Sequence, residues 1–126
     1  MTLPIDRIIE IGYIDQKVID LLGLSITHGT PILLGPLNIQ HMIDRHPEDY
    51  NQYFGELQNI LANPTHVIPN PKDGSLQYIK MLDNFVLAAV RVSGKGNMFS
   101  KSLYQMGPEK IEGFCKRGLF NKYKLF

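Results

Sequence analysis

The second half of the chain contains three apolar runs joined by short turn signals, and this pattern restricts the fold more than any other feature. The runs cover residues 76–82, 85–93 and 98–106. Asp83-Asn84 and Gly94–Asn97 connect them, and connections this short join antiparallel strands. We therefore expect an antiparallel meander, preceded by a short extended piece at residues 66–69 and a turn over residues 70–75.

The first half shows helical spacing instead. Three segments have the apolar spacing or the proline and glycine punctuation of helices: 15–22, 36–46 and 47–63. Asp15 is a suitable N-cap and Gly23 a suitable stop for the first of them. Short apolar stretches are weaker strand candidates: 4–11, 24–27 and 32–34.

After the meander we expect a short helix at residues 108–117 and a loosely held basic tail at 121–124. Helices followed by hairpin-linked strands indicate an α+β fold, with N-terminal helices packed on a small antiparallel sheet. The 126 residues suit one domain, 1–126, with a core that needs no disulfide.

Composition and charge limit the protein's class. The chain is 44% hydrophobic and 20% charged, typical of a soluble globular protein. It shows no signal peptide and no apolar run long enough to cross a membrane, which favours the cytoplasm, or delivery into a target cytoplasm. Most acidic residues lie in the first 60 positions and most basic ones after them. This asymmetry indicates either a face for an anionic partner or two halves that neutralise each other on folding.

One short predicted helix carries two of the four histidines and an arginine. Pro36 favours its first turn and Pro47 discourages its continuation past His46. At about 100° per residue, His46 falls on an apolar flank, while His41 and Arg45 share another flank. Such an imidazole is either a satisfied core histidine or a positioned acid or base.

Polar side chains also interrupt the predicted meander. Lys80 lies in its first strand and Arg91 in the apolar run of its second. In the last strand, Ser100, Ser102 and Tyr104 are expected on one face and Lys101 on the other. All of these are either solvated strand positions or parts of a site that the histidine helix completes.

Such a site would suit cleavage of RNA by its own 2′-hydroxyl. One imidazole takes the hydroxyl proton, an acid protonates the leaving 5′ oxygen, and fixed cations stabilise the charge between them, without a metal. The histidines and Cys115 lack the close spacing of zinc ligands, and Cys115 is expected to be a buried thiol. Gly94-Lys95-Gly96 is too short for a phosphate-binding loop and indicates a hairpin turn.

The run Leu37–Pro47, followed by Ile60-Leu61-Ala62-Asn63-Pro64, resembles phage-associated nuclease-like domains grouped with barnase, EndoU, colicins E5 and D, and RelE. In these domains a histidine-containing helix ending in Arg-His-Pro precedes a helix that closes on Asn-Pro. Strands with basic residues follow, and the last strand carries a hydroxyl residue and an aromatic. The resemblance covers roughly residues 24–106. It implies a ribonuclease fold with a helical lead-in before that core and a helix and basic tail after it.

The resemblance also implies a function: a small metal-independent endoribonuclease without a cofactor, encoded as a toxin or phage effector. RNA would be the substrate, and a cognate inhibitor or immunity protein a further partner. The implied acid and base are His41 and His46, with Lys80 and Arg91 as phosphate clamps. Ser102 and Tyr104 would donate hydrogen bonds or stack on bases. The remaining implied RNA contacts are Arg45, Lys95, Lys101 and Ser100, the last also an alternative to Ser102.

Two other readings stay open. The chain could be a catalytically inactive RNA- or protein-binding phage module of the same fold, or a structural virion component. The discriminating observation is spatial. His41 or His46 within about 6–8 Å of Lys80 or Arg91, in an open groove, supports the enzyme, whereas both histidines packed away from those cations favour the inactive module.

Overall fold

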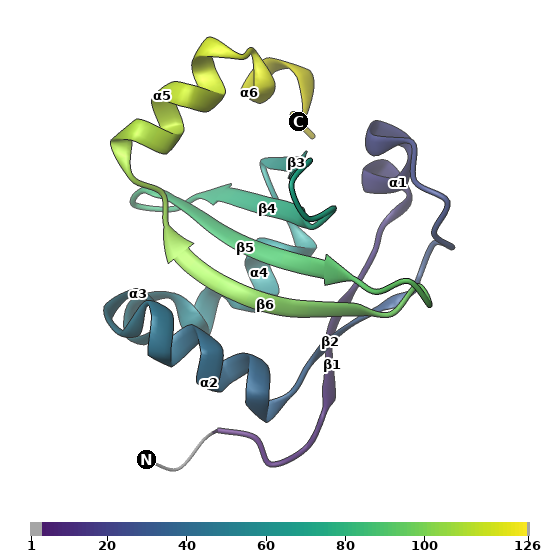
Figure 1. Ribbon diagram of the computed structural model, residues 1–126, viewed down its shortest axis with the longest axis vertical. Helices are drawn as coiled ribbons and strands as arrows, with labels where there is room; N and C mark the ends of the chain where they lie inside the picture. The colour runs from purple at the N-terminus through teal and green to yellow at the C-terminus, as the bar shows by residue number, and fades with distance from the viewer. Residues whose placement is uncertain (1–3, 126) are drawn as a thin grey trace.

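The computed structural model describes residues 4–125, and its centre is one six-stranded sheet. The strands are β1 (Ile9–Tyr13), β2 (Pro31–Leu34), β3 (His66–Pro69), β4 (Leu76–Met81), β5 (Phe85–Val92) and β6 (Met98–Gln105). They lie in the order β1-β2-β6-β5-β4-β3, as Figure 1 shows for the central strands. All neighbours pair antiparallel except β2 and β6, which are parallel. The sheet is therefore mixed.

The predicted meander is confirmed, because β4, β5 and β6 pair in sequence order and end within one residue of the predicted runs. The sheet is larger than predicted, however. Residues 9–13 form an edge strand with a register shift between Glu10 and Gly12, which breaks the alternation on which strand prediction depends. The strand expected at 24–27 is absent: the Leu24 amide donates to Ile19 O, and Thr27 O accepts from Thr30 in a turn.

The helices are α1 (Gln16–Leu22), α2 (Pro36–Arg45), α3 (Pro47–Tyr53), η1 (Phe54–Glu56), α4 (Leu57–Ala62), α5 (Pro108–Lys116) and α6 (Leu119–Lys122). The predicted caps of α1 are confirmed: Asp15 accepts from the Lys17 amide at 2.6 Å, and Gly23 has φ 65°. The single helix expected over 47–63 is interrupted by the 3₁₀ turn η1. Gly55 lies in that turn, and glycine has a low helix propensity.

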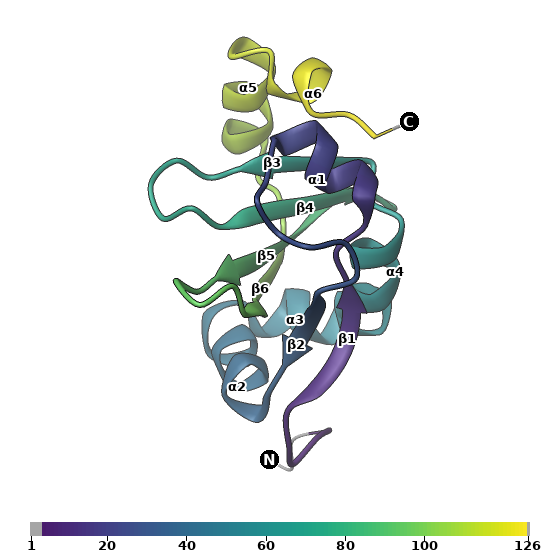
Figure 2. The ribbon, with the colours of Figure 1, turned by 90° about the vertical axis from the view of Figure 1, so that its right-hand side faces the viewer.

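Two apolar clusters cover the two faces of the sheet. The larger contains buried residues of α1, α2 and α4, with Ile39, Met42 and Ile60 fully buried. The smaller lies on the other face, where Phe114 of α5 packs with Ile79 and Leu87. Figure 2 shows α5 and α6 beyond β3 at one end of the sheet, and α2 and α3 on the other side of the β3–β6 strands, level with β1 and β2. Within residues 4–125, every helix is too short or too polar to cross a membrane.

The C-terminal segment is held more firmly than predicted. The Val67 amide of β3 donates to Tyr123 O at 3.3 Å, and the Leu125 amide donates to Thr65 O at 2.9 Å. These bonds fix the predicted loose tail along β3, because that strand has β4 on only one side. Cys115, expected to be buried, is exposed on α5.

His66 on β3 predicts a loss of stability in mild acid. Its side chain is 7% exposed, its ring centroid lies 4.9 Å from that of Phe120, and burial lowers its pKa. The unfolded chain therefore binds a proton at His66 near pH 6.5, whereas the folded chain binds it only at lower pH. The stability that the neutral, buried His66 contributes is complete above pH 6.5 and is lost as pH falls through the lowered pKa of the folded state. We expect the free energy of unfolding in urea to fall more between pH 7.5 and 5 for the native chain than for His66→Gln. An equal fall in both would contradict the assignment.

Candidate functional site

Three of the predicted residues share one face of the β5–β6 ladder. Arg91, Ser102 and Tyr104 lie opposite Phe99, Ala89 and Leu87, respectively. Paired residues project from the same face, and this face carries the smaller apolar cluster. Arg91 is exposed, whereas Ser102 and Tyr104 are half-buried. The face is therefore open where Arg91 lies.

A β-bulge changes the orientation of the first part of β6. Ala89 pairs with Ser102 but Val90 pairs with Ser100, so Lys101 is the extra residue. A bulge shifts the alternation by one position, which explains why the shared face predicted for Ser100, Ser102 and Tyr104 is wrong. Ser100 lies opposite Val90 on the face of the larger cluster, with 0% exposure. Its Oγ has no hydrogen-bond partner within the described chain.

Helix α2 brings the histidines to this edge of the sheet. Pro36 occupies its first turn, and Asn38 Oδ1 accepts from the Gly35 amide at 2.8 Å. The helix packs along β6, and His46 both ends α2 and begins α3. The half-buried His46 ring lies 4.8 Å from the ring of Tyr104, centroid to centroid. The apolar flank of α2 thus fixes one imidazole against the sheet face that carries Arg91.

The other histidine faces a cavity of about 490 Å³ between α2 and the β5–β6 hairpin. His41, Arg91 and Lys101 all line it, together with Asn38 and Phe99. An imidazole, a guanidinium and an ammonium from three different elements therefore border one space that can admit an anion. His41 thus borders the same cavity as Arg91, whereas Lys80 does not line it.

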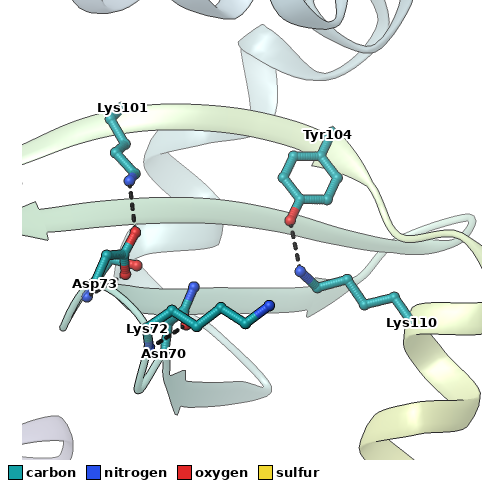
Figure 3. A network of polar contacts seen from close by, with 7 residues as sticks. Asn70, Lys72, Asp73, Lys101, Tyr104 and Lys110 are labelled. Atoms are coloured by element: carbon teal, nitrogen blue, oxygen red, sulfur yellow. Dashed lines mark hydrogen bonds and ion pairs between the residues drawn. The ribbon is translucent and has the colours of Figure 1, made fainter.

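Two further residues support these groups and were missed by sequence reasoning. Lys110 of α5 donates to Tyr104 Oη at 2.9 Å, and Asp73 accepts from Lys101 at 3.0 Å, as Figure 3 shows. Hydrogen bonds from Ser75, and then from Lys101, hold the pKa of the Asp73 carboxyl well below its usual range. The Lys101–Asp73 contact joins residues far apart in sequence, and the Lys110–Tyr104 contact joins β6 to the helix that follows it. Neither pairing follows from the spacing of residues within one element.

The structure does not bring the remaining predicted residues to the cavity. Lys80 lies opposite Val86, on the face of the larger cluster, and its ammonium donates to Asn63 O at 2.7 Å. Arg45 is exposed at the end of α2, and Lys95 is exposed in the turn between β5 and β6. Neither residue lines the cavity.

The position of Lys80 gives a direct test. We expect Lys80→Met to lower the free energy of unfolding by about 1 kcal/mol, because the carbonyl of Asn63 loses a charged donor at the end of α4. Nuclease activity should stay within about twofold, since the ammonium faces away from Arg91. Urea denaturation and RNA cleavage measure the two effects. A large loss of RNA cleavage with an unchanged free energy of unfolding would show that Lys80 takes part in the reaction.

The histidines occupy separate surroundings. The ring of His28 lies 6.1 Å from that of Tyr13, His66 packs against Phe120, and His41 and His46 lie along α2. Throughout residues 4–125, no three His, Cys, Asp or Glu side chains form a group that could hold a metal ion.

Comparison with known proteins identifies one family. A family model described as phage-Barnase-EndoU-ColicinE5/D-RelE like nuclease3 matches residues 9–113, a range that includes β1, α2 and the whole sheet. Neither the curated proteins nor the solved structures gave a significant match. The matched range also includes the first part of α5, which carries Lys110.

Proposed function

Because this chain belongs to the family of phage-associated nucleases similar to barnase, EndoU, colicins E5 and D, and RelE, we propose that it is a metal-independent endoribonuclease. The proposed reaction is attack of a ribose 2′-oxygen on the adjacent phosphorus. The bond from phosphorus to the 5′-oxygen breaks, leaving a cyclic phosphate and a 5′-hydroxyl end. The observation that carries the proposal is the cavity shared by His41, Arg91 and Lys101.

The two histidines supply the proton transfers. One neutral imidazole accepts the proton of the 2′-hydroxyl, and the other, protonated, gives a proton to the leaving 5′-oxygen. His41 borders the cavity and His46 lies against Tyr104, so both are presented by one helix along the same strand. Near neutral pH an imidazole can take either part.

The cations stabilise the pentavalent phosphorane. Arg91 is exposed at the cavity, and its planar guanidinium can donate two parallel hydrogen bonds to phosphate oxygens. Lys101 also borders the cavity, but its ammonium is paired with Asp73 at 3.0 Å. A bound phosphate would compete with that carboxylate for Lys101. Ser102 and Tyr104, on the same face, are proposed as hydrogen-bond donors to the substrate.

The test is incubation of the purified protein with total cellular RNA in EDTA, followed by mapping of new 5′-hydroxyl ends. The proposal expects cleavage that EDTA does not reduce, with cyclic phosphate on the other fragment. Cleavage abolished by the chelator would contradict the metal-free scheme. RNA binding without cleavage would instead identify an inactive binding module.

A further inference from the structure

A second cavity, of about 210 Å³, lies between α5 and the turn that joins β3 to β4. Its lining includes three cations, Lys72, Lys110 and Arg117, and no carboxylate of the described residues contributes to it. The neighbouring acid, Asp73, is engaged by Ser75 and Lys101. Figure 3 shows the Lys72 side chain extended from its turn toward α5. The cavity therefore gathers three positive charges, and among the described residues no carboxylate in its lining pairs with them.

Arg117 and Lys110 are held in place by packing as well as by charge. Both lie over the ring of Phe114, at 5.4 and 5.6 Å from its centroid. Arg117 Nε also donates to Gly113 O at 3.2 Å, one helical turn back. Cations fixed in this way lose little conformational freedom when an anion binds.

Lys110 connects this cavity to the candidate active site. An ammonium group only donates hydrogen bonds, so Tyr104 Oη must be the acceptor in their 2.9 Å contact. The Tyr104 hydroxyl hydrogen then points away from Lys110 and is free for another acceptor. Lys110 of the second cavity thus contacts Tyr104, whose ring in turn packs against the ring of His46.

We propose that the cavity formed by Lys72, Lys110 and Arg117 binds a backbone phosphate of single-stranded RNA, next to the phosphate that is cleaved. This inference rests on the proposed function for the identity of the polymer. The polymer is favoured over a small anion because the cations continue along one face from Arg91 and Lys101 to this cavity. A chain of phosphates can occupy both places at once, and an isolated ion cannot.

The test measures binding of a fluorescent ten-nucleotide single strand without 2′-hydroxyls, which the proposed reaction cannot cleave. Lys72→Ala/Arg117→Ala is expected to weaken binding about tenfold at low salt. The slope of log K against log salt should fall in magnitude by about 0.7, the value expected when one phosphate of a single strand is no longer neutralised. Since no cleavage is involved, the result is readable even if the chain has no nuclease activity.

The matched control is Lys17→Ala/Lys116→Ala, which removes the same charge from exposed positions of α1 and α5 outside the cavity. Its binding should equal that of the native chain. Oligonucleotides with one uncharged methylphosphonate locate the contact: the native chain should lose affinity at one position, and the cavity variant should be insensitive there. If the double variant melts at a much lower temperature, Lys72→Glu alone replaces it, because Lys72 is exposed in a turn.

Equal weakening of oligonucleotide binding in the cavity and control variants would overturn the proposal, because binding would then depend only on the net charge of the protein. Unchanged binding in the cavity variant, or no binding by the native chain, would overturn it as well. RNA cleavage that persists beside either result would leave the proposed function intact. Binding that depends on the cavity, in a native chain that does not cleave RNA, would support the phosphate site and contradict the proposed nuclease function.

Discussion

Replacing His46 with alanine is expected to lower RNA cleavage by at least about 100-fold, because a positioned acid or base contributes about 10²–10⁴ to the rate of such a reaction. The melting temperature should stay within a few degrees. His46 is only half-buried, and the core on its flank is formed by Ile39 and Met42, which the substitution leaves in place. Cleavage of a defined oligoribonucleotide and thermal unfolding measure the two quantities.

His46→Phe separates proton transfer from packing. A phenyl ring can preserve the contact with Tyr104, whose centroid lies 4.8 Å from that of His46, but it carries no titratable nitrogen. It should therefore be as inactive as the alanine variant and closer to the native chain in stability. His28→Ala is the matched control, since this exposed histidine lies beside Tyr13. Unchanged cleavage in both His46 variants would remove His46 from the mechanism.

Local sequence rules predicted the parts of the fold that depend on local geometry. The turns at Asp83-Asn84 and Gly94–Asn97 fixed the meander, and prolines fixed the start of α2 and its separation from α3. The pairing of β2 with β6 could not be predicted in this way. It joins Ile32 to Met98 across the chain and depends on packing of the whole domain.

The candidate site shows the same division. The helical spacing of α2 placed His46 on its apolar flank and His41 on another flank, and Arg91 stood out as a charge in an apolar strand. The sequence does not indicate the bulge at Lys101, which places Ser100 on the opposite face from Ser102 and Tyr104. A one-residue shift reverses every side chain that precedes it on the strand, so alternation alone could not assign that face. Lys110 lies on a separate helix, and only the tertiary fold places it against Tyr104.

Arg91→Ala is expected to lower cleavage by about 10²–10³, the usual effect of removing one group that stabilises charge in a transition state. The fold should be retained, because Arg91 is exposed and its guanidinium makes no ion pair within residues 4–125. The loss should fall equally on kcat and kcat/KM if the guanidinium binds mainly the phosphorane. A rise in KM alone would indicate that it binds substrate and transition state equally.

Arg91→Lys tests the geometry of that contact. Lysine keeps the charge but cannot form two parallel hydrogen bonds to a phosphate, so we expect only partial recovery over the alanine variant. Arg7→Ala is the control for charge, because Arg7 is exposed near the N-terminus and paired with Asp6 at 3.2 Å. If Arg91→Ala unfolds, Arg91 is structural. If it folds and cleaves normally, the cavity shared with His41 is not where the phosphate reacts, since an exposed guanidinium there would strongly influence any phosphorane within reach.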